Sequence, residues 1–208
     1  MKPTDRKQHW EKIYRCKQTN EVSWFQPKPE VSLSLISRFA ISKTAKIIDV
    51  GGGDSLLVDY LLDLGFKDIT VLDISETALE KAKKRLGSKS NQVKWLVSDI
   101  AQFKPTETYE LWHDRAAFHF LTAEKDINNY VDMIRKCIRP GCLLILGTFS
   151  EEGPEKCCGL NIQQYSETSM TNKLKMFFGK NECQKVNHMT PTGGLQNFLF
   201  CSFTKNRS

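Results

Sequence analysis

The chain has 208 residues, of which 40% are hydrophobic, enough for a globular domain with a buried core. Its formal net charge is +6, but basic and acidic residues are mixed along the sequence, which argues against a nucleic-acid-binding protein. The longest apolar runs are too short to cross a bilayer, and no apolar block follows the first charges. We therefore expect no membrane span, no secretory signal and a cytoplasmic location.

The seven cysteines are an odd number without a CxxC pair, and the four histidines lie far apart in the sequence. This pattern predicts no metal site and favours free thiols in a reducing compartment. The adjacent Cys157 and Cys158 lie in a loop bounded by glycine and proline, and their role is left open.

Short apolar runs alternate with helical patterns through the first 150 residues. The runs predict strands at 45–50, 69–72, 93–97, 109–112 and 143–146, and the patterns predict helices at 55–64, 75–86 and 127–138. Ser75 is a suitable N-cap, and Gly65 and Gly87 are suitable helix ends. Because the strand runs are almost continuously apolar, we expect a doubly wound α/β fold with a mostly parallel sheet.

The pattern changes after residue 150. A helix is expected at 166–178, followed by strands at 182–187 and 197–203 that are joined by a turn at 191–194. Two strands joined by a turn predict an antiparallel hairpin at the C-terminal end of the sheet.

The run from Ile47 to Asp54, IIDVGGGD, places three glycines between a strand and a helix. Glycines at such a junction let the backbone turn sharply and approach a ligand closely. Dinucleotide-binding folds use the same geometry, so the glycines alone do not identify the ligand.

Four aspartates narrow the choice of ligand. Asp49 and Asp54 flank the glycines, where two carboxylates would crowd a pyrophosphate but suit a ligand with an ammonium, a sulfonium and ribose hydroxyls. Asp73, at the end of the second strand, is placed to accept hydrogen bonds from ribose hydroxyls. Asp99 follows the third strand and can accept from an adenine amino group, while Ile100 packs on the ring.

Over roughly residues 40–150, the sequence with these motifs resembles the class I S-adenosylmethionine-dependent methyltransferases. Within that class it resembles methyltransferases of type 11/12. The resemblance implies a Rossmann-like seven-stranded sheet with an antiparallel last strand, and S-adenosyl-L-methionine as the cofactor. Ser55 stands where the family's spaced pattern has its third glycine. The expected cofactor-binding residues are Asp49, Gly51, Gly52, Gly53, Asp54, Asp73, Ile74, Asp99, Ile100 and His113.

The resemblance also suggests how one domain, 1–208, is organised. Residues 1–40 form an N-terminal helical cap, 41–150 the cofactor-binding core, and 151–208 a C-terminal helix and antiparallel hairpin. The cap resembles that of thiopurine-methyltransferase-like enzymes and of small lysine methyltransferases. Trp10 and Tyr14, four residues apart, suit helix packing, whereas Trp24 and Phe25 are candidates for covering the cofactor or binding substrate.

The fourth strand is followed by Asp114-Arg115, a distant resemblance to the Asp-Arg-Gly of thiopurine methyltransferases, with Ala116 in place of glycine. Ligands bind beyond the carboxyl ends of strands in this fold, so Arg115 and Phe118 are expected to bind substrate. Asp114 and His119 are expected to be catalytic, because an amine or hydroxyl acceptor needs a base; a structural role for the histidine stays open.

We therefore expect a transferase that methylates a small molecule by in-line displacement. A protein lysine methyltransferase is the nearest alternative, so that a protein substrate stays possible. A non-catalytic nucleotide-binding regulatory module is an alternative from another class. A nicotinamide dehydrogenase is disfavoured because its spaced glycines and catalytic set are missing. The sequence leaves the acceptor atom and the oligomeric state undetermined.

Overall fold

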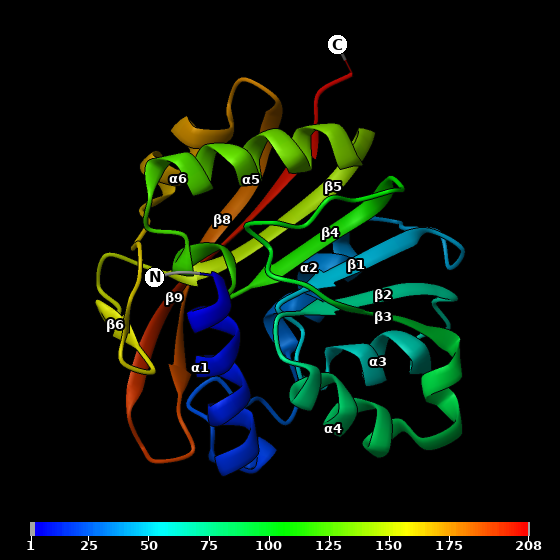
Figure 1. The fold of residues 1–208 in the computed structure, drawn as a ribbon. Helices are drawn as coiled ribbons and strands as arrows, with labels where there is room; N and C mark the ends of the chain where they lie inside the picture. The colour runs from blue at the N-terminus through cyan, green and yellow to red at the C-terminus, as the bar shows by residue number, and fades with distance from the viewer. Residues whose placement is uncertain (1–2, 208) are drawn as a thin grey trace. The chain divides into compact units, whose positions relative to one another are not determined.

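The computed structural model describes residues 3–207, which form two compact units, drawn in Figure 1. The first unit runs to Phe103 and includes Thr190–Gly193, and the second comprises Lys104–Met189 and the residues from Gly194 onward. The expected subdivision at residues 40 and 150 does not coincide with these limits, and the single domain stays a prediction.

Three parallel strands form the sheet of the first unit, in the order β3-β2-β1. They are β1 (Lys46–Val50), β2 (Asp68–Asp73) and β3 (Val93–Val97), close to their predicted positions. β1 and β2 are almost entirely buried, as their apolar sequences predict. Val50 pairs with Leu72, so the carboxyl ends of these two strands lie side by side.

Two helices connect these strands. Helix α3 (Leu57–Asp63) follows β1, and α4 (Glu76–Leu86), with the 3-10 helix η2 (Gly87–Gln92), leads from β2 to β3. Both helices pack against β2, as Figure 1 shows. The prediction that Ser75 caps α4 is confirmed, because its hydroxyl accepts a hydrogen bond from the Ala78 backbone N–H at 3.2 Å.

The N-terminal segment is helical. It contains α1 (Pro3–Cys16), the 3-10 helix η1 (Thr19–Glu21) and α2 (Glu30–Arg38). Helix α1 packs against α4, which places it near the carboxyl end of β2. None of the helices within residues 3–207 is long and apolar enough to span a membrane.

The strands of the second unit pair in the order β4-β5-β9-β8. β4 (Tyr109–Arg115) and β5 (Ile138–Phe149) are parallel, and β9 (Leu195–Lys205) runs antiparallel to both β5 and β8 (Phe178–Met189). The prediction of an antiparallel C-terminal hairpin in an α/β fold is confirmed. The remaining elements are η3 (Phe118–Phe120), α5 (Glu124–Cys137), α6 (Glu167–Leu174) and the small hairpin of β6 (Lys156–Cys157) and β7 (Leu160–Asn161).

All four strands of the second unit are longer than predicted, β5 and β8 the most. β5 begins directly after α5 and includes Pro140 and Gly141, which were expected to stand before the strand. Proline is tolerated there because the pairing of β4 with β5 is irregular over these residues. β8 was predicted only at 182–187, since its polar, largely exposed residues give a weak apolar pattern. Helix α6 ends four residues before its predicted end.

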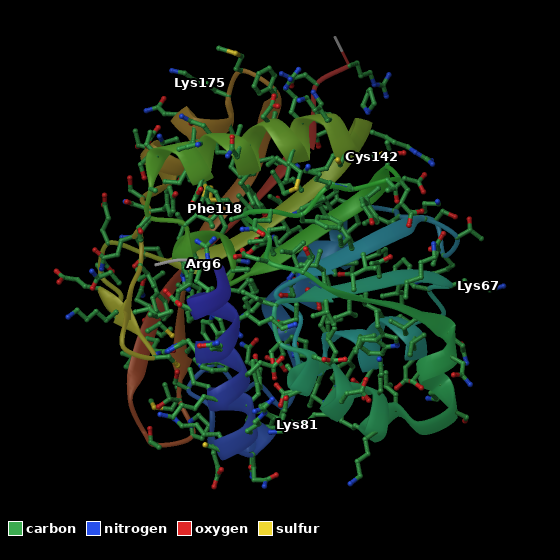
Figure 2. The ribbon with its side chains drawn as sticks, in the orientation of Figure 1. Arg6, Lys67, Lys81, Phe118, Cys142 and Lys175 are labelled. Carbon is green, nitrogen blue, oxygen red and sulfur yellow. A yellow bond between two sulfur atoms is a disulfide. The ribbon has the colours of Figure 1, made fainter. Side chains whose placement is uncertain are left out.

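The expectation that all cysteines are free thiols is wrong for one pair. Cys183 and Cys201 form a disulfide, because the antiparallel register of β8 and β9 places them directly opposite each other with their Cα atoms 4.1 Å apart. Sequence spacing does not reveal a cross-strand pair. Within residues 3–207, the other five cysteines form no disulfide, and Cys142 is among the side chains labelled in Figure 2.

Candidate functional site

The glycine run after β1 forms a tight loop. Gly51 and Gly53 have φ values of +67° and +49°, which favour glycine. A Cβ atom on Gly52 would lie 2.6 Å from Asp49 Oδ2, and one on Gly53 would lie 2.7 Å from the Tyr14 hydroxyl. The backbone is held by the Gly51 N–H, which donates to the Leu72 carbonyl at 2.8 Å. The loop therefore lies between the ends of β1 and β2 and helix α1.

Three buried carboxylates surround this loop: those of Asp49, Asp54 and Asp73. Asp54 is only 2% exposed, and its Oδ2 has no hydrogen-bond partner among the described residues. Burial raises the pKa of Asp54 above its ordinary value, while a hydrogen bond with the Thr19 side chain opposes the shift. A buried carboxylate oxygen of this kind fits a ligand that carries a cationic donor.

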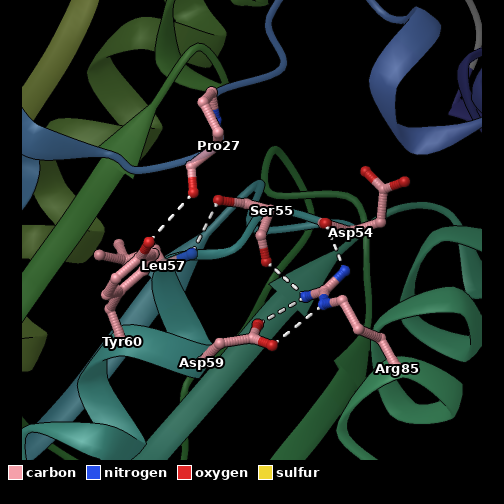
Figure 3. A network of polar contacts seen from close by, with 7 residues as sticks. All are labelled: Pro27, Asp54, Ser55, Leu57, Asp59, Tyr60 and Arg85. Atoms are coloured by element: carbon pink, nitrogen blue, oxygen red, sulfur yellow. Dashed lines mark hydrogen bonds and ion pairs between the residues drawn. The ribbon is translucent and has the colours of Figure 1, made fainter.

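Arg85 of α4 fixes the backbone next to Asp54. Its guanidinium donates to the backbone oxygens of Asp54 and Ser55 at 2.8 Å each and forms an ion pair with Asp59 at 2.7 Å (Figure 3). The Asp54 carboxylate points away from this guanidinium in Figure 3. Arg85 therefore holds the chain while the carboxylate stays available to a ligand.

Asp73 is the last residue of β2, and its carboxylate is buried like those of Asp49 and Asp54. Its Oδ1 accepts a hydrogen bond from the Ser75 backbone N–H at 2.8 Å, and its Oδ2 lies 3.1 Å from the position of a Gly53 Cβ. Burial raises its pKa to about 7, and the negative charges of Asp54, Asp49 and Glu11 add to the rise. Such a carboxyl is stabilised in its ionised form when a ligand donates hydrogen bonds to it.

Asp99 lies beyond the end of β3 and is held from two sides. Its Oδ2 accepts from Arg6 Nε and pairs with Arg6 Nη2, both at 2.9 Å, and its Oδ1 accepts from the Ala101 N–H at 3.0 Å. Figure 2 labels Arg6 in the first turns of α1. A carboxylate oxygen can accept more than one hydrogen bond, so Oδ1 can also accept from an amino group. Ile100 follows directly in the chain.

Helix α1 contributes further contacts that were not predicted. The Glu11 carboxylate accepts from the backbone N–H groups of Glu76 at 2.7 Å and Thr77 at 3.3 Å, so it caps α4. Trp10, Tyr14 and Trp24 form an aromatic cluster, with ring centroids 5.8 Å apart for Trp10 and Trp24 and 6.0 Å for Tyr14 and Trp24. Through the Tyr14 hydroxyl, this cluster reaches Gly53. Phe25 follows Trp24 directly and is half-buried.

The residues of the first unit thus fit S-adenosylmethionine. Gly51 to Gly53 leave backbone room, the unpartnered Asp54 oxygen suits the ammonium, Asp73 suits the ribose hydroxyls, and Asp99 suits the adenine amino group. A pyrophosphate would meet three buried carboxylates instead. Among residues 3–207, no group of three His, Cys, Asp or Glu side chains is arranged to hold a metal ion.

In the second unit, the end of β4 carries a buried carboxylate with three donors. Asp114 Oδ1 accepts from the backbone N–H groups of Ala117 and Phe118, both at 3.0 Å, and Oδ2 accepts from the Tyr130 hydroxyl at 2.7 Å. Burial raises the pKa of Asp114 to about 6 against these hydrogen bonds. Ala116, in the position where the resemblance has glycine, adopts a φ of +64°. The network imposes this left-handed turn on the chain.

After the turn, the other predicted residues pack with aromatic side chains of the second unit. This cluster is called the wall, and it consists of Arg115, Phe118, His119, Phe149, Tyr165 and Phe198. The Arg115 guanidinium lies over the Phe198 ring, with its Cζ 4.9 Å from the centroid. Phe118 stacks on Tyr165 with centroids 5.2 Å apart, and the His119 ring lies 4.8 Å from that of Phe149. Figure 2 labels Phe118 in this wall.

His119 is fully buried, and its two ring nitrogens differ. Nδ1 accepts a hydrogen bond from the Phe149 backbone N–H at 3.2 Å, whereas Nε2 has no partner among the described residues. Burial lowers the pKa of His119 to about 3, with a further contribution from the charge of Arg115. The imidazole is therefore neutral over the working pH range.

The predicted residues thus fall into two groups. The structure brings Asp49, Gly51, Gly52, Gly53, Asp54 and Asp73 around one loop and joins Trp24 to it through Tyr14. It places Ile74 and Ile100 beside Asp73 and Asp99 in the chain. His113, Asp114, Arg115, Phe118 and His119 belong to the second unit, where His113 is buried in β4. Sequence reasoning missed Arg6, Glu11 and Tyr130, whose roles depend on tertiary contacts that local patterns do not show.

Comparison with known proteins agrees with this geometry. Residues 48–144 match the family described as methyltransferase domain. A mouse (Mus musculus) eEF1A lysine and N-terminal methyltransferase is 27% identical over 121 residues, 57% of this chain and 17% of that protein. Malonyl-[acyl-carrier protein] O-methyltransferase 2 of Ilyobacter polytropus is 27% identical over 107 residues, 51% of this chain and 40% of that protein. The chain thus matches less than half the length of these curated relatives.

A solved structure shows the same fold. The 1,6-didemethyltoxoflavin-N1-methyltransferase of Burkholderia thailandensis, with bound 1,6-didemethyltoxoflavin and S-adenosylhomocysteine, superposes with a TM-score of 0.73. The match covers 99% of this chain and 91% of that chain, at 17% identity. Family match and fold agree with the buried carboxylates around the glycine loop, and residues 48–144 are similar to methyltransferase domains.

Proposed function

We propose that the protein transfers the methyl group of S-adenosylmethionine to a small-molecule acceptor. The observation that carries this proposal is the wall of the second unit, in which His119 and Tyr165 are buried and each keeps a polar atom without a partner among the described residues. Enclosed aromatic surroundings with a few polar atoms are typical of small-ligand sites. The fold neighbour from Burkholderia binds a small molecule, which supports the proposal.

The cofactor is held by the first unit. Asp73 accepts from the ribose hydroxyls, Asp99 Oδ1 accepts from the adenine amino group, and Ile74 and Ile100 pack beside the ring. Asp49, Asp54 and the three glycines receive the methionine end. The sulfonium supplies an already activated methyl group. The protein's main task is then to align the acceptor, which can contribute several kcal/mol toward lowering the barrier.

We propose that Asp114 positions the wall instead of exchanging a proton with substrate. Its two oxygens accept three hydrogen bonds from Ala117, Phe118 and Tyr130, which fix the turn after β4. Arg115 and Phe118 are thereby oriented for substrate binding. A thiolate acceptor needs no base, whereas an amine or hydroxyl has to lose its proton to another group or to water.

Labelled cofactor tests the acceptor class. The full chain is incubated with methyl-labelled S-adenosylmethionine and a cell lysate that has been separated into small molecules and macromolecules. We expect label to leave the cofactor only with the small-molecule fraction. Label in a single protein band would instead support a protein lysine methyltransferase, the function suggested by the eEF1A-modifying relative.

Calorimetry with S-adenosylhomocysteine tests the cofactor site itself. Asp73→Ala removes at least one hydrogen bond to a charged acceptor, which contributes about 1.5–3 kcal/mol, so we expect an affinity lower by at least about ten- to hundredfold. Asp63→Ala, which removes only the exposed ion pair with Lys89, serves as the control and retains full affinity. Binding with no turnover on any lysate fraction would favour a regulatory module over an enzyme.

A further inference from the structure

The hydrogen bond at His119 fixes its tautomer. Because the Phe149 N–H donates to Nδ1, that nitrogen carries no proton, and the neutral ring holds its proton on Nε2. Nε2 is thus an N–H donor. A general base would need a free lone pair at this nitrogen, so the geometry disfavours the catalytic role that the sequence suggests for His119.

This donor is buried and has no hydrogen-bond partner among residues 3–207. A buried donor without a hydrogen bond raises the free energy of the folded state. An apolar side chain of similar size would fill the same space at lower free energy. The Tyr165 hydroxyl is a second case, at 2% exposure and with no partner among the described residues. Burial raises the pKa of Tyr165, so the hydroxyl keeps its proton and can donate.

The two donors belong to the same wall. The Tyr165 N–H donates to the Phe149 carbonyl at 3.1 Å, and the Phe149 N–H in turn donates to His119. The positive charge of Arg115 lies near enough to lower the pKa of His119, and its guanidinium packs on Phe198, whose ring is 4.6 Å from that of Phe149. The carboxylate of the nearby Asp114 is already occupied by three donors. The wall therefore offers donors and positive charge.

From this arrangement we infer that the methyl acceptor carries a carboxylate, which binds to the Nε2–H of His119 and the hydroxyl of Tyr165 beside Arg115. The inference rests on the proposed small-molecule function and names its substrate class. Charge-assisted hydrogen bonds from two neutral donors and a neighbouring guanidinium select an anionic oxygen over a hydroxyl or an amine. His119 and Tyr165 are then specificity-determining residues that bind substrate.

Matched acids and alcohols test the inference without methyl transfer. Benzoate, phenylacetate and phenylpropionate are titrated by calorimetry into the full chain saturated with S-adenosylhomocysteine, each beside the primary alcohol of the same skeleton. We expect at least one acid to bind at millimolar concentration or below, and its alcohol to bind at least about tenfold more weakly. Equal binding of acid and alcohol, or binding of none of the acids, overturns the inference.

Tyr165→Phe separates a ligand role from a structural one. It deletes only an unpartnered buried hydroxyl, so the melting temperature stays unchanged or rises, while affinity for the best acid falls about tenfold or more. A lower melting temperature with unchanged acid affinity would contradict the inference. Tyr60→Phe is the matched control: its hydroxyl donates to the Pro27 carbonyl at 3.2 Å in the first unit, so acid binding is unaffected.

Two substitutions of His119 by amide side chains distinguish the roles of its two ring nitrogens. His119→Asn keeps an acceptor near Phe149 N–H but cannot reach the Nε2 position, so we expect acid affinity to fall. His119→Gln places an amide N–H near that position and restores part of the affinity. Equal loss in both variants counts against the donor role. Acid binding is measured without turnover, so it can be interpreted whatever the lysate assay shows. Label found only in protein in that assay would refute the proposed function but would not change the measured acid affinities.

Discussion

Gly52 shows how closely the loop backbone approaches its neighbours. A Cβ atom there would lie 2.6 Å from Asp49 Oδ2 and 2.8 Å from Val71 Cγ1, so Gly52→Ala has to displace the carboxylate. We expect a loss of about 1–3 kcal/mol in unfolding free energy and at least about tenfold weaker S-adenosylhomocysteine binding, measured by urea denaturation and calorimetry. In Gly179→Ala, where the nearest atom is 3.7 Å away, both quantities should stay unchanged.

Asp73 makes cofactor binding depend on pH. Its pKa of about 7 means that much of the free protein carries a neutral carboxyl below neutrality, whereas ribose hydroxyls donate best to the ionised form. Affinity for S-adenosylhomocysteine should therefore rise as the pH increases through 7 and level off above it. Asp73→Asn should bind more weakly and lose this step. An unchanged step in calorimetry from pH 5.5 to 8.5 (roughly the window around this pKa) would assign it to another group.

The acids of the cofactor site could be predicted because they occupy local positions. Asp49, Asp73 and Asp99 each stand at the end of an apolar strand run, and carboxyl ends of parallel strands meet at one edge. The partners of these acids could not be predicted in this way. Arg6 reaches Asp99 across 93 positions of sequence, and only the packing of α1 brings it there.

Helix α1 stabilises the site through α4. Glu11→Gln weakens the cap on the Glu76 and Thr77 N–H groups and removes a negative charge near the positive end of α4, so unfolding free energy should fall by about 1 kcal/mol. The same charge raises the pKa of Asp73, so the midpoint of the pH step in S-adenosylhomocysteine affinity should move to lower pH.

The control for this variant is Glu80→Gln on the exposed side of α4. Within residues 3–207, Glu80 forms only a surface ion pair with Lys83, and such pairs contribute about 0–1 kcal/mol. We expect no shift of the pH midpoint in this control. A shift of equal size in both variants would show that long-range charge, and not the contact of Glu11 with α4, sets the midpoint.

The hairpin of β8 and β9 is joined by the Cys183–Cys201 disulfide, which links residues 18 positions apart. Closing a loop of this length restricts the unfolded chain and stabilises the fold by about 3 kcal/mol. Urea denaturation with and without reductant should show this difference, and the double variant Cys183→Ala, Cys201→Ala should match the reduced protein. Cys16→Ala, at an exposed free thiol, should respond to reductant like the wild type. Equal stability with and without reductant would contradict the expectation.

Strands with largely apolar sequences were the easiest elements to predict. β3 was found at 93–97, as expected, whereas the early part of β5 and the ends of β8 carry exposed polar residues or proline. Their extension depends on pairing with β4 and β9, which is not encoded in local periodicity. The disulfide was missed for the same reason, since register decides which cysteines meet.

Over the whole chain, buried titratable groups divide between the two units. Asp73 belongs to the first unit, and Asp114 and His119 belong to the second. The two aspartates have raised pKa values of about 7 and about 6, while His119 has a lowered pKa of about 3. Buried groups with such shifts make the stability of the molecule depend on pH in opposite directions.

The range from pH 4 to 6 lies between the ordinary pKa values of aspartate (3.8) and histidine (6.5), so unfolded aspartates are ionised there and unfolded histidines are protonated. Each aspartate is more protonated in the folded than in the unfolded chain, so its contribution to stability is lost as pH rises. His119 is more protonated in the unfolded chain, so its contribution grows as pH rises. Each group changes the unfolding free energy by about 1.4 kcal/mol per pH unit.

His119→Asn removes the opposing contribution. We therefore expect its unfolding free energy to fall with pH more steeply than that of the wild type, by about 1.4 kcal/mol per pH unit between pH 4 and 6. Urea denaturation at intervals across this range measures both slopes. Tyr165→Phe, which changes no group that titrates there, should run parallel to the wild type. Parallel curves for His119→Asn and the wild type would mean that the folded protein protonates His119 normally, and the buried neutral donor would have to be abandoned.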